Sequence, residues 1–139
     1  IIDRNLKIKK NLDLFKLSNK RKTYIFTSSN NKKKIIFLKN KKIKVIKMNR
    51  LEYKNDFDDL FRKIFKLGNG RILIESGLIF LSQLIKFKFI NNLYLFKSND
   101  ILKNRGYNNT NIRLIKRLKL DNILRVNLKN DKLFKVFIK

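Results

Sequence analysis

Short apolar runs separated by polar turns predict that the chain folds from alternating strands and helices. The runs are rich in β-branched and aromatic residues and are bounded by Asn, Ser or Gly, which is typical of strands. The pattern predicts strands at 23–27, 43–46, 71–75, 92–96, 113–120, 123–128 and 132–138, with a strand end at 1–3. The run 35–38 suits either a short helix or a strand. Asn130 and Asp131 predict a turn between the last two strands.

The clearest helix is predicted over residues 55–68. Its apolar residues are three or four positions apart and form one face: Phe57, Leu60, Phe61 and Ile64. Acidic residues cluster in its first turn and basic residues in its last, as the helix dipole favours. Asn55 is the expected N-cap, and Gly68 is expected to end the helix.

A second helix is predicted at 77–88, between strands 71–75 and 92–96. This spacing predicts a crossover in which the two strands lie parallel in one sheet with the helix packed on it. The expected fold is α/β, with a mostly parallel central sheet that closes in a C-terminal antiparallel hairpin. The chain shows no repeat and no linker, so residues 1–139 are expected to form a single domain.

The junction at the end of strand 71–75 carries candidate chemistry. Ligands of open α/β sheets bind beyond the carboxyl ends of strands, and Glu75 is predicted to lie there. The amides after Ser76 begin a helix and attract phosphate, while Gly77 lets a ligand approach the backbone closely. The alternative is structural: Glu75 is an exposed strand end, Ser76 caps the helix, and Gly77 relieves crowding.

Composition changes this picture in two ways. The 139 residues include 36 basic and 10 acidic side chains, a net charge of +26, which suggests a polyanionic partner. However, the lysines are spread along the whole chain, and abundant Lys, Ile, Asn, Leu and Phe without proline is typical of an AT-rich genome. We therefore favour compositional bias. The absence of Cys and His excludes disulfides, Cys/His zinc sites and histidine acid–base catalysis, and no metal is expected.

No membrane or export signal is expected in this sequence. The most apolar run, 78–90, contains Lys86 and Lys88 and is too short to span a bilayer. The first residues lack the long apolar run of a signal peptide, so a cytoplasmic location is expected. Because the chain begins with Ile1, it is expected to be a piece of a longer protein.

The segment ILIESGLIFLSQLIKFKFINNLYLF, residues 72–96, resembles the reductase domain of the bifunctional riboflavin-biosynthesis deaminase/reductase. Residues 72–77 match that family's [IV]-x-[IV]-E-[GA]-G signature, with Ser76 at the position of the usual Gly or Ala. The helix and strand that follow fit as well. The stretches IIDRNLKI, TYIFTSS, IKVIKM and DFDDLFRKIFKLGNGRILIES are similar to family segments in the same order. The stretch SNDILKNRGYNN, residues 98–109, departs from the family's P-x-[LIV]-[LF]-G loop, and only Gly106 matches a position of that loop.

The resemblance implies a three-layer fold like that of dihydrofolate reductase. It implies NADPH-dependent reduction of 5-amino-6-(5-phosphoribosylamino)uracil, a phosphoribosyl-pyrimidine, to its ribitylamino form. It places Glu75 at the substrate and Arg4 near the cofactor. The implied lining of the NADPH site is Gly77, Leu78, Ile79, Phe80, Leu81, Ser82 and Gln83. The nicotinamide supplies the hydride, so no catalytic side chain is assigned.

The resemblance also implies missing parts. It covers only part of the family's reductase domain, without the N-terminal portion and the upstream zinc deaminase domain. The 139-residue chain alone is therefore expected to be inactive. A homo-oligomer is left open.

Two alternatives are retained. A related reductase of another pyrimidine or of a pterin would share this fold. A basic nucleic-acid-binding module would use the lysine-rich stretches 19–22 and 31–47, with Tyr24, Phe26 and Phe37 stacking on bases. We expect these aromatic residues to be core and the lysines to be a solvated face, so nucleic acid is not the favoured partner. A continuous basic groove would favour nucleic acid, whereas scattered charge with a cleft at Glu75 would favour the reductase.

Overall fold

The computed structural model describes residues 1–98 and 117–138. The chain divides into two compact units, Ile1–Ile72 and Leu73–Lys139. That residues 1–139 form a single domain stays a prediction.

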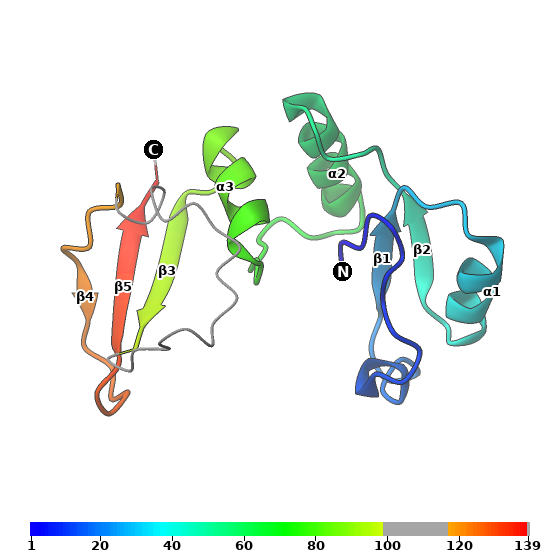
Figure 1. Cartoon of the computed structure of the whole chain (residues 1–139), viewed down its shortest axis with the longest axis horizontal. Coiled ribbons are helices and arrows are strands. Elements are labelled where there is room, and N and C mark those ends of the chain that lie inside the picture. The colour runs from blue at the N-terminus through cyan, green and yellow to red at the C-terminus, as the bar shows by residue number, and fades with distance from the viewer. Residues whose placement is uncertain (99–116, 139) are drawn as a thin grey trace, which may run out of the picture. The chain divides into compact units, whose positions relative to one another are not determined.

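The first unit is built on two parallel strands, β1 (Tyr24–Thr27) and β2 (Lys44–Lys47), with Tyr24 opposite Lys44 and Thr27 opposite Lys47 (Figure 1). A parallel pair needs a crossover connection, and helix α1 (Lys32–Asn40) supplies it. A short 3₁₀ helix, η1 (Asp13–Phe15), precedes β1. The predicted strands 23–27 and 43–46 are confirmed, and the ambiguous run 35–38 lies within a helix.

Helix α2 (Lys54–Lys66) confirms the predicted helix 55–68. Its N-cap is Tyr53, so the expectation for Asn55 is wrong. The reason lies at Asp56, whose carboxylate accepts the backbone amides of Glu52 and Tyr53, both at 3.1 Å, and so fixes an earlier helix start. Gly68 follows the helix with φ of 89°, a left-handed conformation that glycine adopts readily, which confirms its role as terminator.

The core of the first unit joins the N-terminal segment, the parallel strands and α1. Its fully packed side chains are Leu6, Phe15, Ile25, Leu38 and Ile43. The ring of Phe15 meets that of Phe37 edge to face, with 5.4 Å between centroids. Burial of these side chains, rather than helix propensity, holds α1 against the strands.

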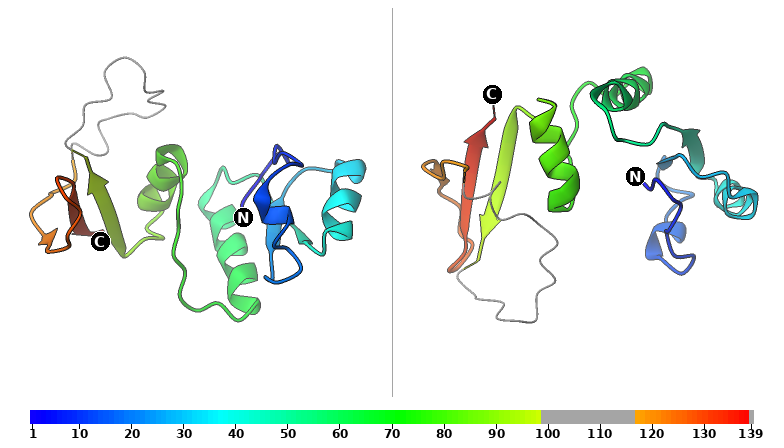
Figure 2. Two further views of the ribbon diagram at one scale, coloured as in Figure 1. Left: turned by 90° about the horizontal axis from the view of Figure 1, so that it is seen from below. Right: turned by 45° about the horizontal axis from the view of Figure 1, so that its top comes forward.

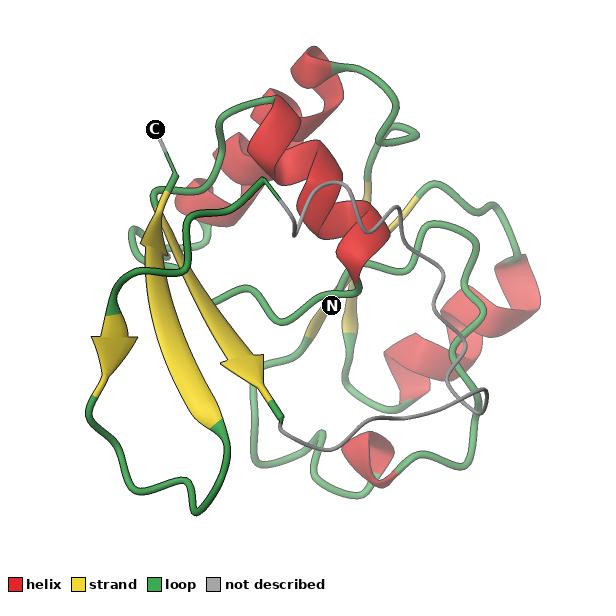
Figure 3. Cartoon of the chain, turned by 60° about the vertical axis from the view of Figure 1, so that its left-hand side comes forward, coloured by secondary structure: helices red, strands yellow, loops and turns green. Residues whose placement is uncertain are grey.

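The second unit contains helix α3 (Leu78–Lys86) and an antiparallel sheet in the order β3-β5-β4. The strands are β3 (Asn92–Lys97), β4 (Ile123–Leu124) and β5 (Lys132–Phe137). Figures 2 and 3 show β3 and β5 side by side. Helix 77–88, strand 92–96 and the antiparallel terminal hairpin are confirmed. Of strand 123–128 only two residues pair. Residues 113–116 lie outside the described residues, and 117–120 form no strand.

The predicted strand 71–75 is wrong, because these residues have no regular secondary structure. The predicted parallel pairing of 71–75 with 92–96 is therefore not formed. The run is apolar, but Ile72 and Leu73 are exposed, and a central parallel strand needs cover on both faces. In residues 1–98 and 117–138 the fold is a mixed α/β arrangement with one small parallel and one small antiparallel sheet. The three-layer dihydrofolate-reductase-like fold stays a prediction.

In the part of the chain that the structure describes, no helix has the length and apolar character needed to cross a membrane.

Candidate functional site

Glu75, the predicted substrate residue, lies in the extended segment that leads into α3. Glu75, Ser76 and Gly77 are all exposed. Residues 71–74 form no strand, so Glu75 does not lie at a strand's carboxyl end. It does lie near a helix start, three residues before the first helical residue, Leu78.

Gly77 begins α3 as its N-cap, with φ of −68° and ψ of 158°. Ser76 is therefore not the cap. A Cβ at Gly77 would meet no atom within 4 Å, so crowding does not explain this glycine. Gly77 also offers no side chain to accept hydrogen bonds from the first-turn amides. The helix start is thus open to a ligand that approaches the backbone.

The predicted cofactor residues 77–83 occupy the first turns of α3. Ile79 is exposed, whereas the others from Leu78 to Gln83 are half-buried, and Leu84 is fully buried. The hydroxyl of Ser82 donates to the carbonyl of Ile79 at 2.7 Å, so it is already engaged within the helix. Any contact of α3 with a ligand would therefore come mainly from the backbone of its first turn.

Arg4, the remaining predicted cofactor residue, belongs to the first unit. Its carbonyl accepts hydrogen bonds from the Thr27 hydroxyl at 2.9 Å and from the Ser28 hydroxyl at 3.0 Å. The residue is exposed, and its backbone is held at the carboxyl end of β1. That Arg4 contacts the cofactor stays a prediction.

Sequence reasoning missed a polar cluster at the carboxyl ends of β1 and β2. We call it the carboxyl-edge cluster; its members are Arg4, Ser28, Ser29, Asn30 and Lys47. The ammonium of Lys47 donates to the Ser29 carbonyl and to the Asn30 side chain, so it joins the two strand ends. Carboxyl ends of parallel strands are where α/β sheets bind ligands.

Helix α1 adds positive charge next to the carboxyl-edge cluster. It begins with Lys32, Lys33 and Lys34 in its first turn, at the end where the helix dipole is already positive. Asn31 caps this start by accepting the Lys34 amide at 3.0 Å. The stretch TSSNNKKK after a predicted strand was the signal that could have located this edge. An anion bound at the start of α1 would reduce the repulsion between these lysines and the positive end of the helix dipole.

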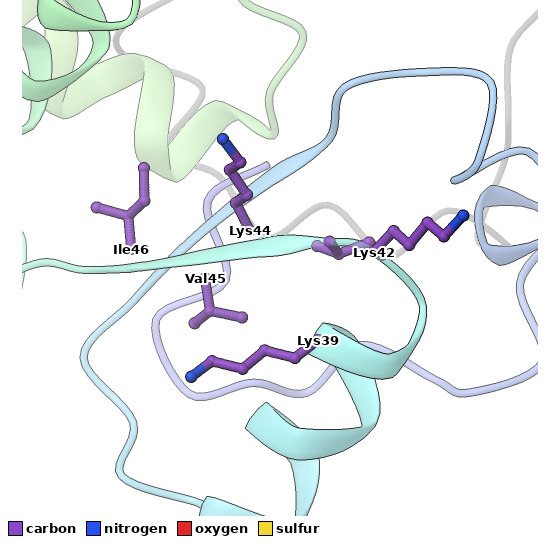
Figure 4. A pocket seen from close by; sticks show the side chains of 6 residues that line it. Lys39, Lys42, Lys44, Val45 and Ile46 are labelled. Atoms are coloured by element: carbon purple, nitrogen blue, oxygen red, sulfur yellow. The ribbon is translucent and has the colours of Figure 1, made fainter.

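A hollow of about 510 Å³ lies at the opposite end of β2 and is lined by Lys39, Lys42, Ile43, Lys44, Val45 and Ile46. Figure 4 shows the ammonium groups of Lys39, Lys42 and Lys44 pointing in three different directions. A convergent anion site would bring them together. The hollow also lies at the amino end of β2, away from the edge where such sheets bind ligands, so it does not mark the site.

No protein-family model and no curated protein sequence matches the chain.

Proposed function

We propose that the chain is part of an NADPH-dependent reductase of riboflavin biosynthesis. Its substrate is 5-amino-6-(5-phosphoribosylamino)uracil, whose ribosyl side chain becomes ribityl. The observation that carries the proposal is the Glu75–Ser76–Gly77 segment at the open start of α3, within an ordered set of segments similar to that family.

The chemistry asked of this chain is binding and alignment. NADPH supplies the hydride when it is bound. An exposed carboxylate at Glu75 suits the hydroxyl and amino donors of a ribosylaminopyrimidine, because charge-assisted hydrogen bonds are the stronger ones. The open backbone at Gly77 suits a phosphate at a helix start.

The carboxyl-edge cluster also supports a phosphate-rich cofactor. The backbone of Arg4 is held at the carboxyl end of β1, and Lys32 and Lys33 begin α1 five residues beyond that strand. The Lys34 ammonium is already engaged, because it donates to the Leu6 carbonyl. NADPH carries a diphosphate and a further phosphate, so it offers the anionic groups that such an edge favours.

The substrate role of Glu75 is tested by Glu75→Gln in the full-length protein. This change keeps the size of the side chain but removes its charge, and a hydrogen bond to a charged group contributes about 1.5–3 kcal/mol. We expect kcat/KM to fall roughly ten- to a hundredfold, with the NADPH dissociation constant and the melting temperature unchanged. Steady-state NADPH oxidation and thermal melting provide these quantities. A much lower melting temperature with full activity of the folded fraction would make Glu75 structural.

The cofactor role of the α3 start is tested by Gly77→Ala, with Gly70→Ala as the matched control. Neither added methyl group would meet an atom within 4 Å, so both variants should fold normally. We expect weaker NADPH binding, by about tenfold, only for Gly77→Ala, because the methyl group would occupy the space that the ligand needs. Equal NADPH affinity of both variants, measured by fluorescence titration, would remove α3 from the cofactor site.

A further inference from the structure

One face of the antiparallel sheet in the second unit leaves three aromatic side chains in solvent. Tyr94, Phe96 and Phe137 are 48%, 66% and 63% exposed. The opposite face is covered, because Phe134 and Val136 are buried and Leu93 and Leu95 are half-buried. An alternating strand normally places polar residues on its solvent face, so three exposed rings on one face require another explanation.

Strand register gathers these rings around one lysine. Tyr94 lies directly opposite Lys135, and Asn92 lies opposite Phe137. Phe96 and Phe137 are therefore within two positions of the Tyr94–Lys135 pair, on the same face. The ammonium of Lys135 lies 4.8 Å from the centroid of the Phe137 ring. We name Tyr94, Phe96, Lys135 and Phe137 the outer sheet face.

Lys135 supplies the positive charge at the centre of this face. Lys97 and Lys132 are next to Phe96 and Leu133 in their strands, so side-chain alternation places them on the opposite face. Three aromatic rings around a lysine match what a ligand with both flat bases and phosphates requires.

We propose that the outer sheet face binds single-stranded nucleic acid, with bases stacked on its aromatic rings and phosphates near Lys135. This binding goes beyond the reductase function. It uses other residues than the sequence suggested, since Phe26 is buried and Phe37 packs against Phe15 in the core. Sequence reasoning did not separate stacking aromatics from core aromatics because it lacked the register of β3 and β5.

Spacing favours single strands over duplex. Tyr94 and Phe96 are two residues apart on one strand, which is about 6.8 Å at 3.4 Å per residue. Stacked bases in a duplex strand are about 3.4 Å apart, so consecutive bases must separate to use both rings. An unpaired strand can separate its bases, whereas a duplex exposes no base faces.

Charge argues against a second copy of this chain as the occupant. A two-fold contact through this face would bring Lys135 of each copy to the same interface. Burying two like charges without an acidic partner is costly. The residues that surround Lys135 on this face are aromatic or uncharged, so none supplies that partner.

The decisive probe is an oligothymidylate of about ten nucleotides, a usual length for single-strand sites, compared with an abasic oligomer of equal length. Both carry the same phosphates, so only stacking separates them. At about 0.15 M salt we expect the wild-type chain to bind the oligothymidylate roughly five- to a hundredfold more tightly, measured by fluorescence anisotropy. Equal affinity for the two oligomers would overturn the proposal.

Variants locate the binding. Phe96→Leu and Phe137→Leu keep an apolar strand residue but remove the ring, and each should weaken oligothymidylate binding about tenfold without changing abasic binding. Phe65→Leu is the matched control, because Phe65 is 69% exposed on α2. A loss of the same size in Phe65→Leu would place stacking elsewhere.

Two measurements on the wild-type chain do not depend on whether a variant folds. Photocrosslinking of the wild-type chain to 5-iodouracil in the oligomer should label peptides that contain Tyr94, Phe96 or Phe137. Labels confined to other peptides would overturn the assignment. Sedimentation tests whether this face instead joins two copies of the chain. We expect no self-association of the wild-type chain of the kind that would be reversed by oligothymidylate and abolished by Phe96→Leu. A dimer with both properties would identify the outer sheet face as a contact between copies.

Discussion

Asp56 shows how one carboxylate can set the start of a helix. It accepts hydrogen bonds from the backbone amides of Glu52 and Tyr53, both at 3.1 Å, and so ties the two residues before α2 to its first turn. Hydrogen bonds from Tyr53 and Glu52 lower the pKa of Asp56 below its ordinary value, because they favour the charged form. The sequence pattern placed the helix correctly but suggested Asn55 as its cap. Residue preferences alone cannot show which side chain accepts the backbone amides that precede the helix.

Asp56→Ala should lower the free energy of unfolding at neutral pH by about 1 kcal/mol, the usual cost of losing such a cap. A lowered folded-state pKa contributes stability above the unfolded-state pKa, about 3.9, and that stability is lost as the pH falls through the folded-state pKa. The difference between variant and wild type should therefore shrink below about pH 4. Urea unfolding followed by circular dichroism at several pH values measures this.

Asp58→Ala serves as the control for Asp56→Ala. Asp58 pairs with Lys54 at 2.9 Å on the helix surface, and such pairs contribute only about 0.3–0.5 kcal/mol. Equal losses in the two variants would show that the backbone hydrogen bonds of Asp56 add nothing.

Among the elements, α2 and the segment 71–75 mark the two limits of prediction from sequence. Apolar residues of α2 recur every three or four positions, and Gly68 ends the helix because glycine adopts a positive φ readily. Both features depend only on neighbouring residues in the sequence. Segment 71–75 has equally good local chemistry for a strand, but a strand exists only where a neighbour accepts its hydrogen bonds. The candidate site divides in the same way. The helix start at Gly77 follows from the local sequence, whereas the strand predicted before Glu75 needed a partner strand and did not form.

Helix α1 carries an electrostatic conflict that predicts the effect of charge reversal. Lys33 lies in the first turn and is exposed, where the helix dipole disfavours a cation. Lys33→Glu should raise the free energy of unfolding by about 0.3–1 kcal/mol, whereas Lys39→Glu in the last turn should lower it by a similar amount. Thermal melting at low salt checks both.

The same pair of variants separates stability from binding. If the carboxyl-edge cluster receives a cofactor phosphate, Lys33→Glu should weaken NADPH binding while it stabilises the fold, and Lys39→Glu should not affect that affinity. A lower melting temperature for Lys33→Glu would contradict the dipole argument.

At the scale of the whole molecule, charge is the dominant property. The chain carries +26, and the three ion pairs found among the described residues all join side chains three or four positions apart. No long-range pairing in this set neutralises the lysines. A surface charged in this way attracts any polyanion without reading its sequence.

Duplex DNA should therefore bind weakly, without sequence preference, and with an affinity that falls steeply between 50 and 200 mM salt, as phosphate-driven binding does. Filter binding or anisotropy against two unrelated duplexes measures this. Phe96→Leu should leave duplex binding unchanged, because duplex exposes no base faces to the ring. Tight binding to one duplex sequence at physiological salt would mean that the basic surface is a specific DNA site rather than compositional bias.

The central position of β5 in its sheet has a consequence for how the protein is made. Among the residues that the structure describes, β3 pairs with β5 alone. The two strands end roughly 40 residues apart, at Lys97 and Phe137, a distance that a ribosome covers in about 2–8 seconds. During that interval the apolar side chains of β3, Leu93 and Leu95, have been synthesised but lack their partner strand. Unpaired apolar strands associate with one another readily. The second unit is thus most exposed to aggregation while the chain is still being translated, whereas β1 and β2 complete their pairing within a much shorter stretch of synthesis.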